Sequence, residues 1–321
     1  MSGRGHELLF LERDVPWYRR SRDFAAPFVH LYESLAELRT RFADAVRDAD
    51  LVVVGSFVPE GVAVGEWALE TAGGFVAFWD LDTPVTAAKL ARGDDEYLTR
   101  DLVWRYDLYL SFTGGPLLEQ LGARRPVPFY CLVDAELYRP LAAERRYALG
   151  YLGTYSAERQ DALDRLLLGP ARLLPDERFV VGGAQYPETV SWPANVKHID
   201  HVPPGKHPRF YAAQRLTLNV TRQPMVEAGW SPSVRLFEAA ACGVAVVSDW
   251  WPGLDAFFTP GDEILVARSA EDIVGLLQNA DSDELAEIGR RARARVLAEH
   301  TAERRAEQLE RHVAQLMDVA A

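Results

Sequence analysis

The chain has 321 residues, of which 48% are hydrophobic and 26% are charged. This composition predicts a globular protein of two domains, and it excludes a disordered chain, a coiled coil and a fibrous repeat. The formal net charge is −12, so DNA and RNA are not expected partners, because proteins that bind them present basic surfaces. No transmembrane run or signal-peptide pattern is found. The chain has 2 cysteines, which suits the reducing cytoplasm.

Apolar runs and amphipathic segments alternate over the first half of the chain. The expected strands cover residues 8–11, 51–54, 75–79, 108–110 and 127–131. The expected helices cover residues 31–49, 60–72 and 85–92. Repeated strand, turn and helix is typical of a parallel sheet with helices on both faces.

The same alternation starts again in the second half. The expected strands cover residues 147–152, 179–181, 196–199, 216–220, 244–247 and 264–266. The expected helices cover residues 157–168, 232–242, 270–279 and 283–318. These patterns predict an N-terminal domain over 1–142, a C-terminal domain over 143–298, and a helix over 299–321 that packs back toward the first domain.

The segment from Ser231 to Gly243 has the local chemistry of a capped helix. Ser231 is the expected N-cap, Pro232 the first helical residue, and Gly243 the residue just past the helix end. Arg235 and Glu238 are three residues apart and so share a face near the helix start. A helix N-terminus with an arginine suits a diphosphate, and the glutamate suits the hydroxyls of a ribose. The alternative is a core helix with an Arg–Glu pair on its surface.

Several motifs resemble those of known enzymes. The run from Glu238 to Asp249, followed by Gly253-Leu-Asp255 and Pro260–Glu263, resembles the donor-domain signature of GT-B glycosyltransferases, and Val133–Pro140 resembles the segment that precedes that domain. Four further segments resemble the CgeB-like family of the spore-maturation type, namely Glu12–Tyr18, Asp80–Pro84, Leu110–Pro116 and Gly150–Ser156.

The resemblance implies an α/β chain of the GT-B fold, with two Rossmann-like, doubly wound parallel-sheet domains that face each other across a cleft. The C-terminal domain would hold a nucleotide-sugar donor and the N-terminal domain an acceptor. Glu238 would bind the ribose, and Arg235 with the backbone around Ser231 and Ser233 would lie by the diphosphate. The remaining expected donor contacts are Gly153, Thr154, Tyr155, Arg159, Asn219 and Arg222. For Arg159, a helix-surface arginine is the alternative.

One position departs from the family pattern. Many retaining GT-B enzymes carry a glutamate eight residues before the ribose glutamate, where this chain has Trp230. The retaining or inverting outcome therefore stays open. Trp230 is expected either to stack on the sugar or the base, or to pack in the core.

Two patterns raise the question of a metal. Asp80 and Asp82 form a D-x-D pair at a strand end, but the same pattern occurs twice more in this acidic chain. Asp82 is the candidate base for the acceptor hydroxyl, with a turn-capping aspartate as the alternative. His198 and His201 lack a third ligand at a recognised spacing and are expected to be a loop pair. No metal and no cofactor is therefore expected.

These observations predict a cytoplasmic glycosyltransferase of the hexosyltransferase type, whose acceptor is unknown. The alternatives are a non-catalytic spore-coat or polysaccharide-associated protein with the same fold, and a sugar-nucleotide epimerase. Family members usually open with a strand, a glycine turn and a helix, which this chain lacks before Arg4–Glu7. We therefore expect the strands at 8–11 and 51–54 either to lie beside the empty position of a missing strand or to have closed up against each other.

Overall fold

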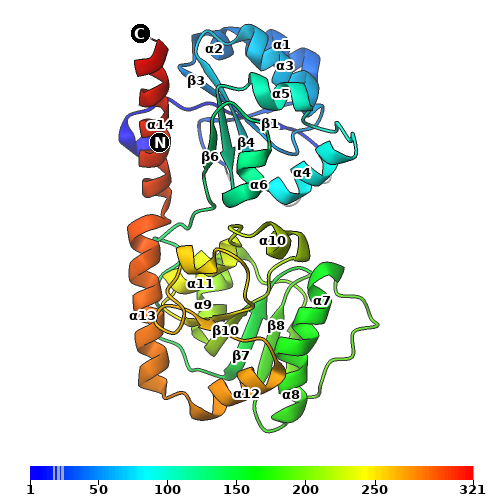
Figure 1. Ribbon diagram of the computed structural model, residues 1–321, viewed down its shortest axis with the longest axis vertical. Helices are drawn as coiled ribbons and strands as arrows, with labels where there is room; N and C mark the ends of the chain where they lie inside the picture. Colours follow the sequence, from blue (N-terminus) through cyan, green and yellow to red (C-terminus); the bar gives the residue numbers. More distant parts are fainter. Residues whose placement is uncertain (17–18, 20–21, 23–24, 321) are drawn as a thin grey trace. The chain divides into compact units, whose positions relative to one another are not determined.

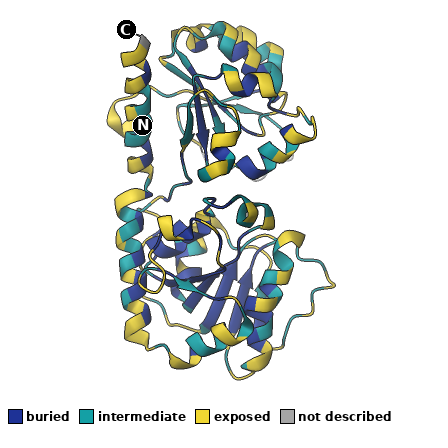
Figure 2. Cartoon of the chain, in the orientation of Figure 1, coloured by how far each residue is buried: buried dark blue, intermediate teal, exposed yellow. Residues whose placement is uncertain are grey.

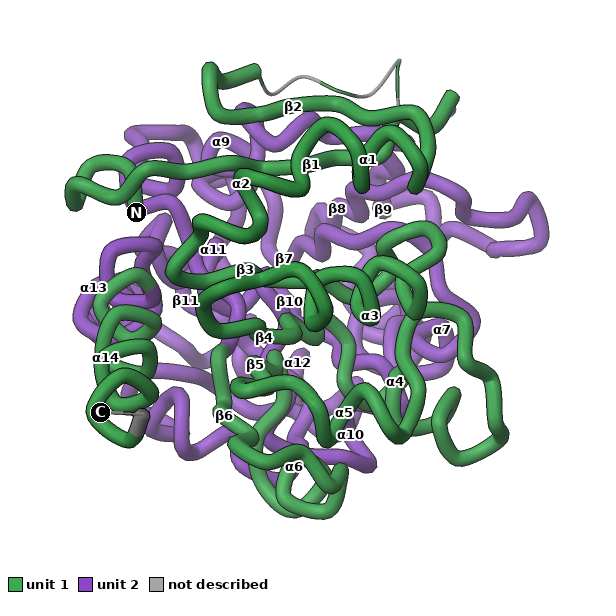
Figure 3. The backbone as a smooth tube through the Cα atoms, turned by 90° about the horizontal axis from the view of Figure 1, so that it is seen from above, with its two compact units in different colours: residues 1–129, 306–321 green, residues 130–305 purple. Residues whose placement is uncertain are grey.

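The computed structural model describes residues 1–321 except 17, 18, 20, 21, 23, 24 and 321. The chain forms two compact units, one of residues 1–129 with 306–321 and one of residues 130–305 (Figures 1 and 3). The residues near the C-terminus therefore belong to the first unit. Among the described residues, no helix has the length and apolar character needed to cross a membrane.

The second unit is built on one sheet of six parallel strands. The strands are β7 (Tyr147–Leu152), β8 (Phe179–Gly182), β9 (Val196–Ile199), β10 (Gln214–Asn219), β11 (Ala245–Ser248) and β12 (Leu265–Val266). Their spatial order is β12-β11-β10-β7-β8-β9. This is the Rossmann order. The first three strands follow one another toward one edge of the sheet, and the strand order then reverses, so that the fourth strand, here β10, lies beside the first, here β7.

Helices complete the second unit. They are α7 (Ala157–Leu163), a π-helical turn η2 (Asp164–Leu168), α8 (Gly169–Leu173), η3 (Pro204–Lys206), α9 (His207–Ala212), α10 (Gln223–Ala228), α11 (Val234–Ala241), η4 (Leu254–Ala256), α12 (Ala270–Asn279) and α13 (Ser282–Glu299). Helix α11 packs on α13, β10 and β11, and α12 packs on α8. Apolar side chains of strands and helices form a fully buried core, which is dark blue in Figure 2.

The segment expected to be helical over residues 283–318 is helical, but it is divided in two near residue 299, where the C-terminal helix was expected to begin. Two helices, α13 and α14 (Ala302–Ala320), meet at His300 and Thr301. The backbone of Val133 pairs there, because its N–H donates to the carbonyl of His300 at 2.9 Å and its carbonyl accepts from Ala302 at 3.3 Å. These bonds occupy backbone groups that a continuous helix would use internally.

The first unit contains a four-stranded parallel sheet in the order β3-β4-β5-β6. Its strands are β3 (Leu51–Gly55), β4 (Phe75–Asp80), β5 (Leu108–Ser111) and β6 (Pro126–Pro128). Its helices are η1 (Ser2–Arg4), α1 (Leu35–Arg41), α2 (Ala43–Asp48), α3 (Gly61–Thr71), α4 (Thr83–Ala91), α5 (Arg100–Arg105) and α6 (Gly115–Gln120). Helix α14 adds Leu316 to a small apolar core with β4 and β5.

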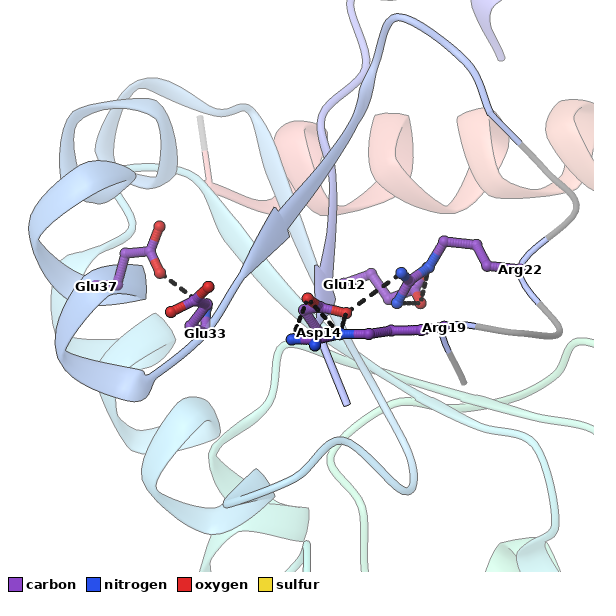
Figure 4. A network of polar contacts seen from close by, with 6 residues as sticks. All are labelled: Glu12, Asp14, Arg19, Arg22, Glu33 and Glu37. Atoms are coloured by element: carbon purple, nitrogen blue, oxygen red, sulfur yellow. Dashed lines mark hydrogen bonds and ion pairs between the residues drawn. The ribbon is translucent and has the colours of Figure 1, made fainter. Parts of the chain in front are cut away.

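Two further strands, β1 (Phe10–Arg13) and β2 (Val29–Tyr32), pair in parallel as a separate sheet. Among the described residues β1 and β3 do not pair, so they have not joined into one sheet. Arg22 pairs with Glu12 of β1, and Arg19 pairs with Asp14, the residue that follows β1 (Figure 4). The motif residues 17 and 18 lie outside the described residues.

The helix expected over residues 31–49 is wrong at its start and in its middle. Residues 29–32 form β2, and α1 starts after the N-cap Ser34, whose hydroxyl accepts from Glu37 N at 3.1 Å. The Glu37 carboxylate returns to the N–H of Glu33 at 2.7 Å, as Figure 4 shows. The apolar residues at steps of three and four continue from β2 into α1, so their spacing did not reveal the helix start. The capping residues Ser34 and Glu37 do mark it.

Candidate active site

The reversal of strand order in the second unit brings the expected donor residues together. Gly153 directly follows β7, and Asn219 is the last residue of β10, its paired neighbour. Ligands of open parallel sheets bind outside the carboxyl ends of the strands at such a reversal. Sequence and topology therefore point to the same edge of the sheet.

Arg235 bridges the two strands at this point. It lies one residue into α11 and is 8% exposed. Its Nε donates to the carbonyl of Leu152, the last residue of β7, and its Nη1 donates to Asn219 Oδ1 at 3.0 Å. The guanidinium lies over the ring of Tyr151, 4.7 Å from the centroid. The side chain is thus held by β7 and β10 together.

The expected start of the helix is wrong by two residues. Ser233 is the N-cap of α11, and its carbonyl accepts from Leu236 N at 3.1 Å. The carbonyl of Pro232 instead accepts from the thiol of Cys131 at 3.6 Å, and Ser231 is buried ahead of the helix. The Ser233 hydroxyl does not cap the helix, because it donates to Asn219 Oδ1 at 2.8 Å. The helix end agrees with the sequence, since Gly243 has φ of 71°.

Gly153 is required by close packing. A Cβ at this position would lie 2.5 Å from Tyr151 Oη and 2.7 Å from Arg235 Nη2. The sequence suggested that the missing side chain leaves room for a phosphate, whereas in the structure it leaves room for the guanidinium. The Gly153 N–H donates to Gly182 O at 2.8 Å, and its carbonyl accepts from Tyr186 Oη at 3.1 Å.

The other expected donor contacts after β7 are Thr154, Tyr155 and Arg159, and each makes a different contact within the second unit. Thr154 is exposed, and its carbonyl accepts from Arg159 Nη2 at 2.6 Å. Tyr155 packs edge-on against Tyr186, with ring centroids 5.5 Å apart. Arg159 is not a simple surface arginine, because its Nε is buried without a hydrogen-bond partner and burial lowers the pKa of its guanidinium.

The arginines at this edge differ in their counter-charges. Arg222 pairs with Glu158 at 2.9 Å. In the part of the chain that the structure describes, neither Arg159 nor Arg235 forms an ion pair with a carboxylate. A buried cation is costly to leave uncompensated, so the buried guanidinium of Arg235 favours an anionic ligand, and the half-buried Arg159 adds a second positive charge beside it.

Glu238 lies one turn further along α11, with 14% of its side chain exposed. Its Oε2 accepts from Tyr211 Oη at 3.2 Å and lies 3.8 Å from His207 Nδ1. Tyr138 also bonds His207, at 3.1 Å. Burial raises the pKa of the Glu238 carboxyl, but the bonds from His207, Tyr138 and Tyr211 outweigh it and lower the pKa below its usual value. The group is therefore a carboxylate, able to accept from hydroxyls.

The side chains that hold Arg235 and Glu238 in place were not predicted from the sequence. No recognised sequence spacing marks the four side chains concerned, which are Tyr151, Tyr211, His207 and Asp249. For Asp249 there was a usable signal, because it follows the strand at 244–247 and so lies at the same carboxyl edge of the sheet. Tyr138, Tyr151 and Asp249 all stood inside quoted motifs but had no assigned role.

Trp230 has a packing role. Its φ is 42°, and its N–H donates to Pro252 O at 2.7 Å. A Cβ on Gly253 would lie 2.6 Å from the Trp230 ring. Trp230 is partly exposed and lies outside the buried core, so it packs on Gly253 without the expected burial in the core, and stacking on a ligand stays a prediction.

In the first unit, the two aspartates of the D-x-D pair differ. Asp80 is fully buried and accepts from Tyr109 Oη and Thr86 Oγ1, each at 2.7 Å. Burial raises the pKa of its carboxyl, and these hydrogen bonds oppose that effect. Asp82 is partly exposed and precedes α4 without a side-chain capping bond. Asp80 is therefore held by hydrogen bonds within the fold, and the role of Asp82 as a base stays a prediction.

The expected histidine pair is also placed. His198 lies in β9, where its ring stacks on Trp192 at 4.8 Å and its Nε2 donates to Gly183 O at 3.0 Å. His201 lies in the exposed loop that follows. Among the described residues, no group of three or more potential metal ligands is found.

Comparison with known proteins gives both a family match and a fold. Residues 159–311 match the family described as glycosyl transferase-like. No curated protein matches the chain. The structure resembles Anabaena HepE, solved with UDP-glucose, at 15% identity over 97% of this chain and 99% of that chain, with a TM-score of 0.68.

Two further solved structures are similar. An alpha-glucosyltransferase in complex with UDP-glucose and abasic-site DNA has 13% identity over 98% of this chain and 92% of that chain, with a TM-score of 0.68. Sucrose-phosphate synthase from Thermosynechococcus elongatus has 14% identity over 92% and 82%, with a TM-score of 0.63. The predicted GT-B fold is confirmed by these neighbours, and the predicted glycosyltransferase class by the family match.

Proposed function

We propose that this GT-B glycosyltransferase takes a hexose from a UDP-sugar and transfers it to an acceptor hydroxyl, with the donor diphosphate bound between Arg235 and Arg159. The observation that carries the proposal is the buried guanidinium of Arg235 beside the half-buried one of Arg159 at the strand reversal of the second unit, neither of which has a carboxylate partner among the described residues. A diphosphate would supply the missing negative charge. The choice of UDP rests on the names of the similar structures, two of which hold UDP-glucose.

Arg235 is held ready to bind an anion. Its Nε and Nη1 are occupied by Leu152 O and Asn219 Oδ1. Its Nη2 lies above Gly153, and the described residues give that nitrogen no acceptor. A guanidinium fixed on two sides loses little freedom when its third nitrogen binds a phosphate oxygen. Because the group is in place before the reaction, it can stabilise the negative charge that develops on the leaving diphosphate.

The remaining donor contacts follow from the same edge of the sheet. The Glu238 carboxylate would accept from the ribose hydroxyls, because the hydrogen bonds to it keep it ionised. The arginines would take the role of a cation, so the reaction would need neither metal nor cofactor. Asp82 of the first unit would remove the proton of the acceptor hydroxyl. The CgeB-like family and a cytoplasmic location also remain part of the proposal.

The decisive experiment is calorimetric titration with UDP. The wild-type chain should bind UDP, and R235K should bind it at least 10-fold more weakly, because a lysine cannot bond both strands and a phosphate at once. The matched control is R215K. Arg215 lies at the opposite end of β10 and pairs with Glu177 at 3.4 Å, so its replacement should leave UDP affinity unchanged.

The reaction class is tested with a UDP-sugar panel. Release of UDP together with a glycosylated product supports transfer. An isomerised nucleotide-sugar without released UDP would identify an epimerase. Absence of both UDP binding and turnover would refute transfer from a UDP-sugar, and it is the result expected of a non-catalytic protein with the same fold.

A further inference from the structure

A chain of buried hydrogen bonds runs from Arg235 to a carboxylate that the donor site does not itself use. Asn219 accepts from Arg235 Nη1 and Ser233 Oγ on its amide oxygen. Its amide nitrogen donates to Ser248 Oγ at 2.9 Å and Thr221 Oγ1 at 3.2 Å. Asn219 and Ser248 are fully buried and Thr221 nearly so. Two strand ends are thereby linked behind the guanidinium.

The chain ends at Asp249, which follows β11. Its Oδ1 accepts from Thr221 Oγ1 at 2.9 Å and from Ser248 Oγ at 3.2 Å. Its Oδ2 accepts from the Thr221 N–H at 2.9 Å. Asp249 is 9% exposed, so water contributes little to these contacts. Burial raises the pKa of the Asp249 carboxyl, and the hydrogen bonds from Thr221 and Ser248 oppose that effect by favouring the ionised form. As a carboxylate, this side chain can only accept.

The direction of every hydrogen bond follows from that property. Each hydroxyl has a single proton and gives it to Asp249, so each hydroxyl oxygen is left to accept from Asn219. The two amide hydrogens of Asn219 are both consumed in this way. Its amide oxygen must then face the other side, where Arg235 and Ser233 both donate. A turn of the amide by 180° would place donors against the guanidinium.

We propose that Asp249 is a positioning residue for donor binding, because its carboxylate fixes the orientation of the Asn219 amide and, through it, the place of Arg235. The proposal rests on the proposed function, since it assigns Arg235 to the donor diphosphate. Asp249 itself touches neither donor nor reacting atoms. Its effect is transmitted through the hydroxyls of Thr221 and Ser248.

The test reverses the donor-to-acceptor direction of the hydrogen bonds between Asp249 and Asn219. In D249N, which has almost the same shape, the new amide nitrogen stands where Oδ1 accepted and donates to both hydroxyls. Those hydroxyls then point their protons at Asn219, whose amide has to turn and present its NH2 to Arg235. We expect D249N to bind UDP about 10-fold more weakly than wild type, with kcat changed less than KM for the donor.

A double variant again places an acceptor opposite Arg235 and Ser233. In D249N with N219D, the residue at 219 is a carboxylate, which accepts from the hydroxyls on one side and from Arg235 and Ser233 on the other. The position of Arg235 is read in the ligand-free protein from its side-chain Nε–H NMR signal, assigned with R235K. The signal should move in D249N and return toward its wild-type position in the double variant.

Controls separate the possible failures. D80N removes a buried carboxylate of the first unit that also accepts from a threonine hydroxyl, and it should lower stability without changing UDP affinity. If wild type binds no UDP, the proposed function fails, while the NMR test of Asp249 still stands. The role of Asp249 is overturned if D249N leaves the Arg235 signal unmoved, if the double variant does not restore it, or if wild type and D249N bind UDP equally.

Discussion

Replacement of Glu238 tests the donor site most directly. In E238Q the side chain keeps its shape and one acceptor oxygen, so Tyr211 Oη, which lies 3.2 Å from Glu238 Oε2, can still be satisfied. The variant loses the charge that would accept from two ribose hydroxyls. A hydrogen bond to a charged group contributes about 1.5–3 kcal/mol, roughly 10- to 150-fold in affinity. We expect E238Q at the lower end of that range and E238A at the upper end.

Stability separates the two variants in a second way. In E238A the hydroxyl of Tyr211, a residue that is 0% exposed, loses this acceptor. A buried group left without a partner costs about 1–3 kcal/mol, so E238A should melt several degrees lower while E238Q melts near wild type. The control E177Q removes the carboxylate of the ion pair at the other end of the sheet, and it should leave nucleotide binding unchanged.

The assay is calorimetric titration with UDP and with UMP. If Glu238 contacts the ribose, both nucleotides lose affinity by the same factor in E238Q, because they share that sugar. The assignment to the ribose is refuted if E238Q binds UDP within threefold of wild type with the fold intact. It is also refuted if only UDP is affected, since that would place Glu238 at the diphosphate.

Three further predictions concern other parts of the chain. G153A should weaken UDP binding about 10-fold, because its methyl group would lie 2.7 Å from Arg235 Nη2; G205A, which has open space, is the control, and equal affinities would contradict the packing argument. Burial lowers the pKa of His300 to about 3, so the unfolded chain binds the extra proton below pH 6.5 and stability should fall as pH falls from 6.5 toward 3, by up to about 1.4 kcal/mol per pH unit. Urea unfolding at pH 6 and pH 4.5 measures how far the free energy of unfolding falls with pH, and this fall should be smaller in H300N than in wild type. An equal fall in both proteins would count against a neutral, buried His300. EDTA should leave turnover unchanged, whereas loss of activity with recovery on adding Mn²⁺ would require metal ligands and a different mechanism.

Local patterns in the sequence determined much of this protein. Apolar runs separated by turn residues placed most strands to within three residues, and the strands at 147–152 and 196–199 agree at both ends. Such runs are readable because a strand buried on both faces is apolar along its whole length. Gly243 ended its helix as expected, because a residue in the left-handed region favours glycine. The α/β class and the two-domain alternation were therefore visible without coordinates, and the GT-B class followed from the resemblance of the motifs.

Tertiary structure decided what depends on groups far apart in the chain. The spacing of Arg235 and Glu238 marked them as a pair, but only the fold shows that Arg235 spans two strand ends while Glu238 bonds Tyr211. Asp249 acts through residues about 30 positions away, and no local spacing encodes such a contact. The start of α11 also moved from Ser231 to Ser233, because the Pro232 carbonyl bonds Cys131 outside the helix and the Ser233 hydroxyl bonds Asn219. Propensity fixes which elements form, whereas hydrogen bonds between strand ends fix which side chains a ligand would meet.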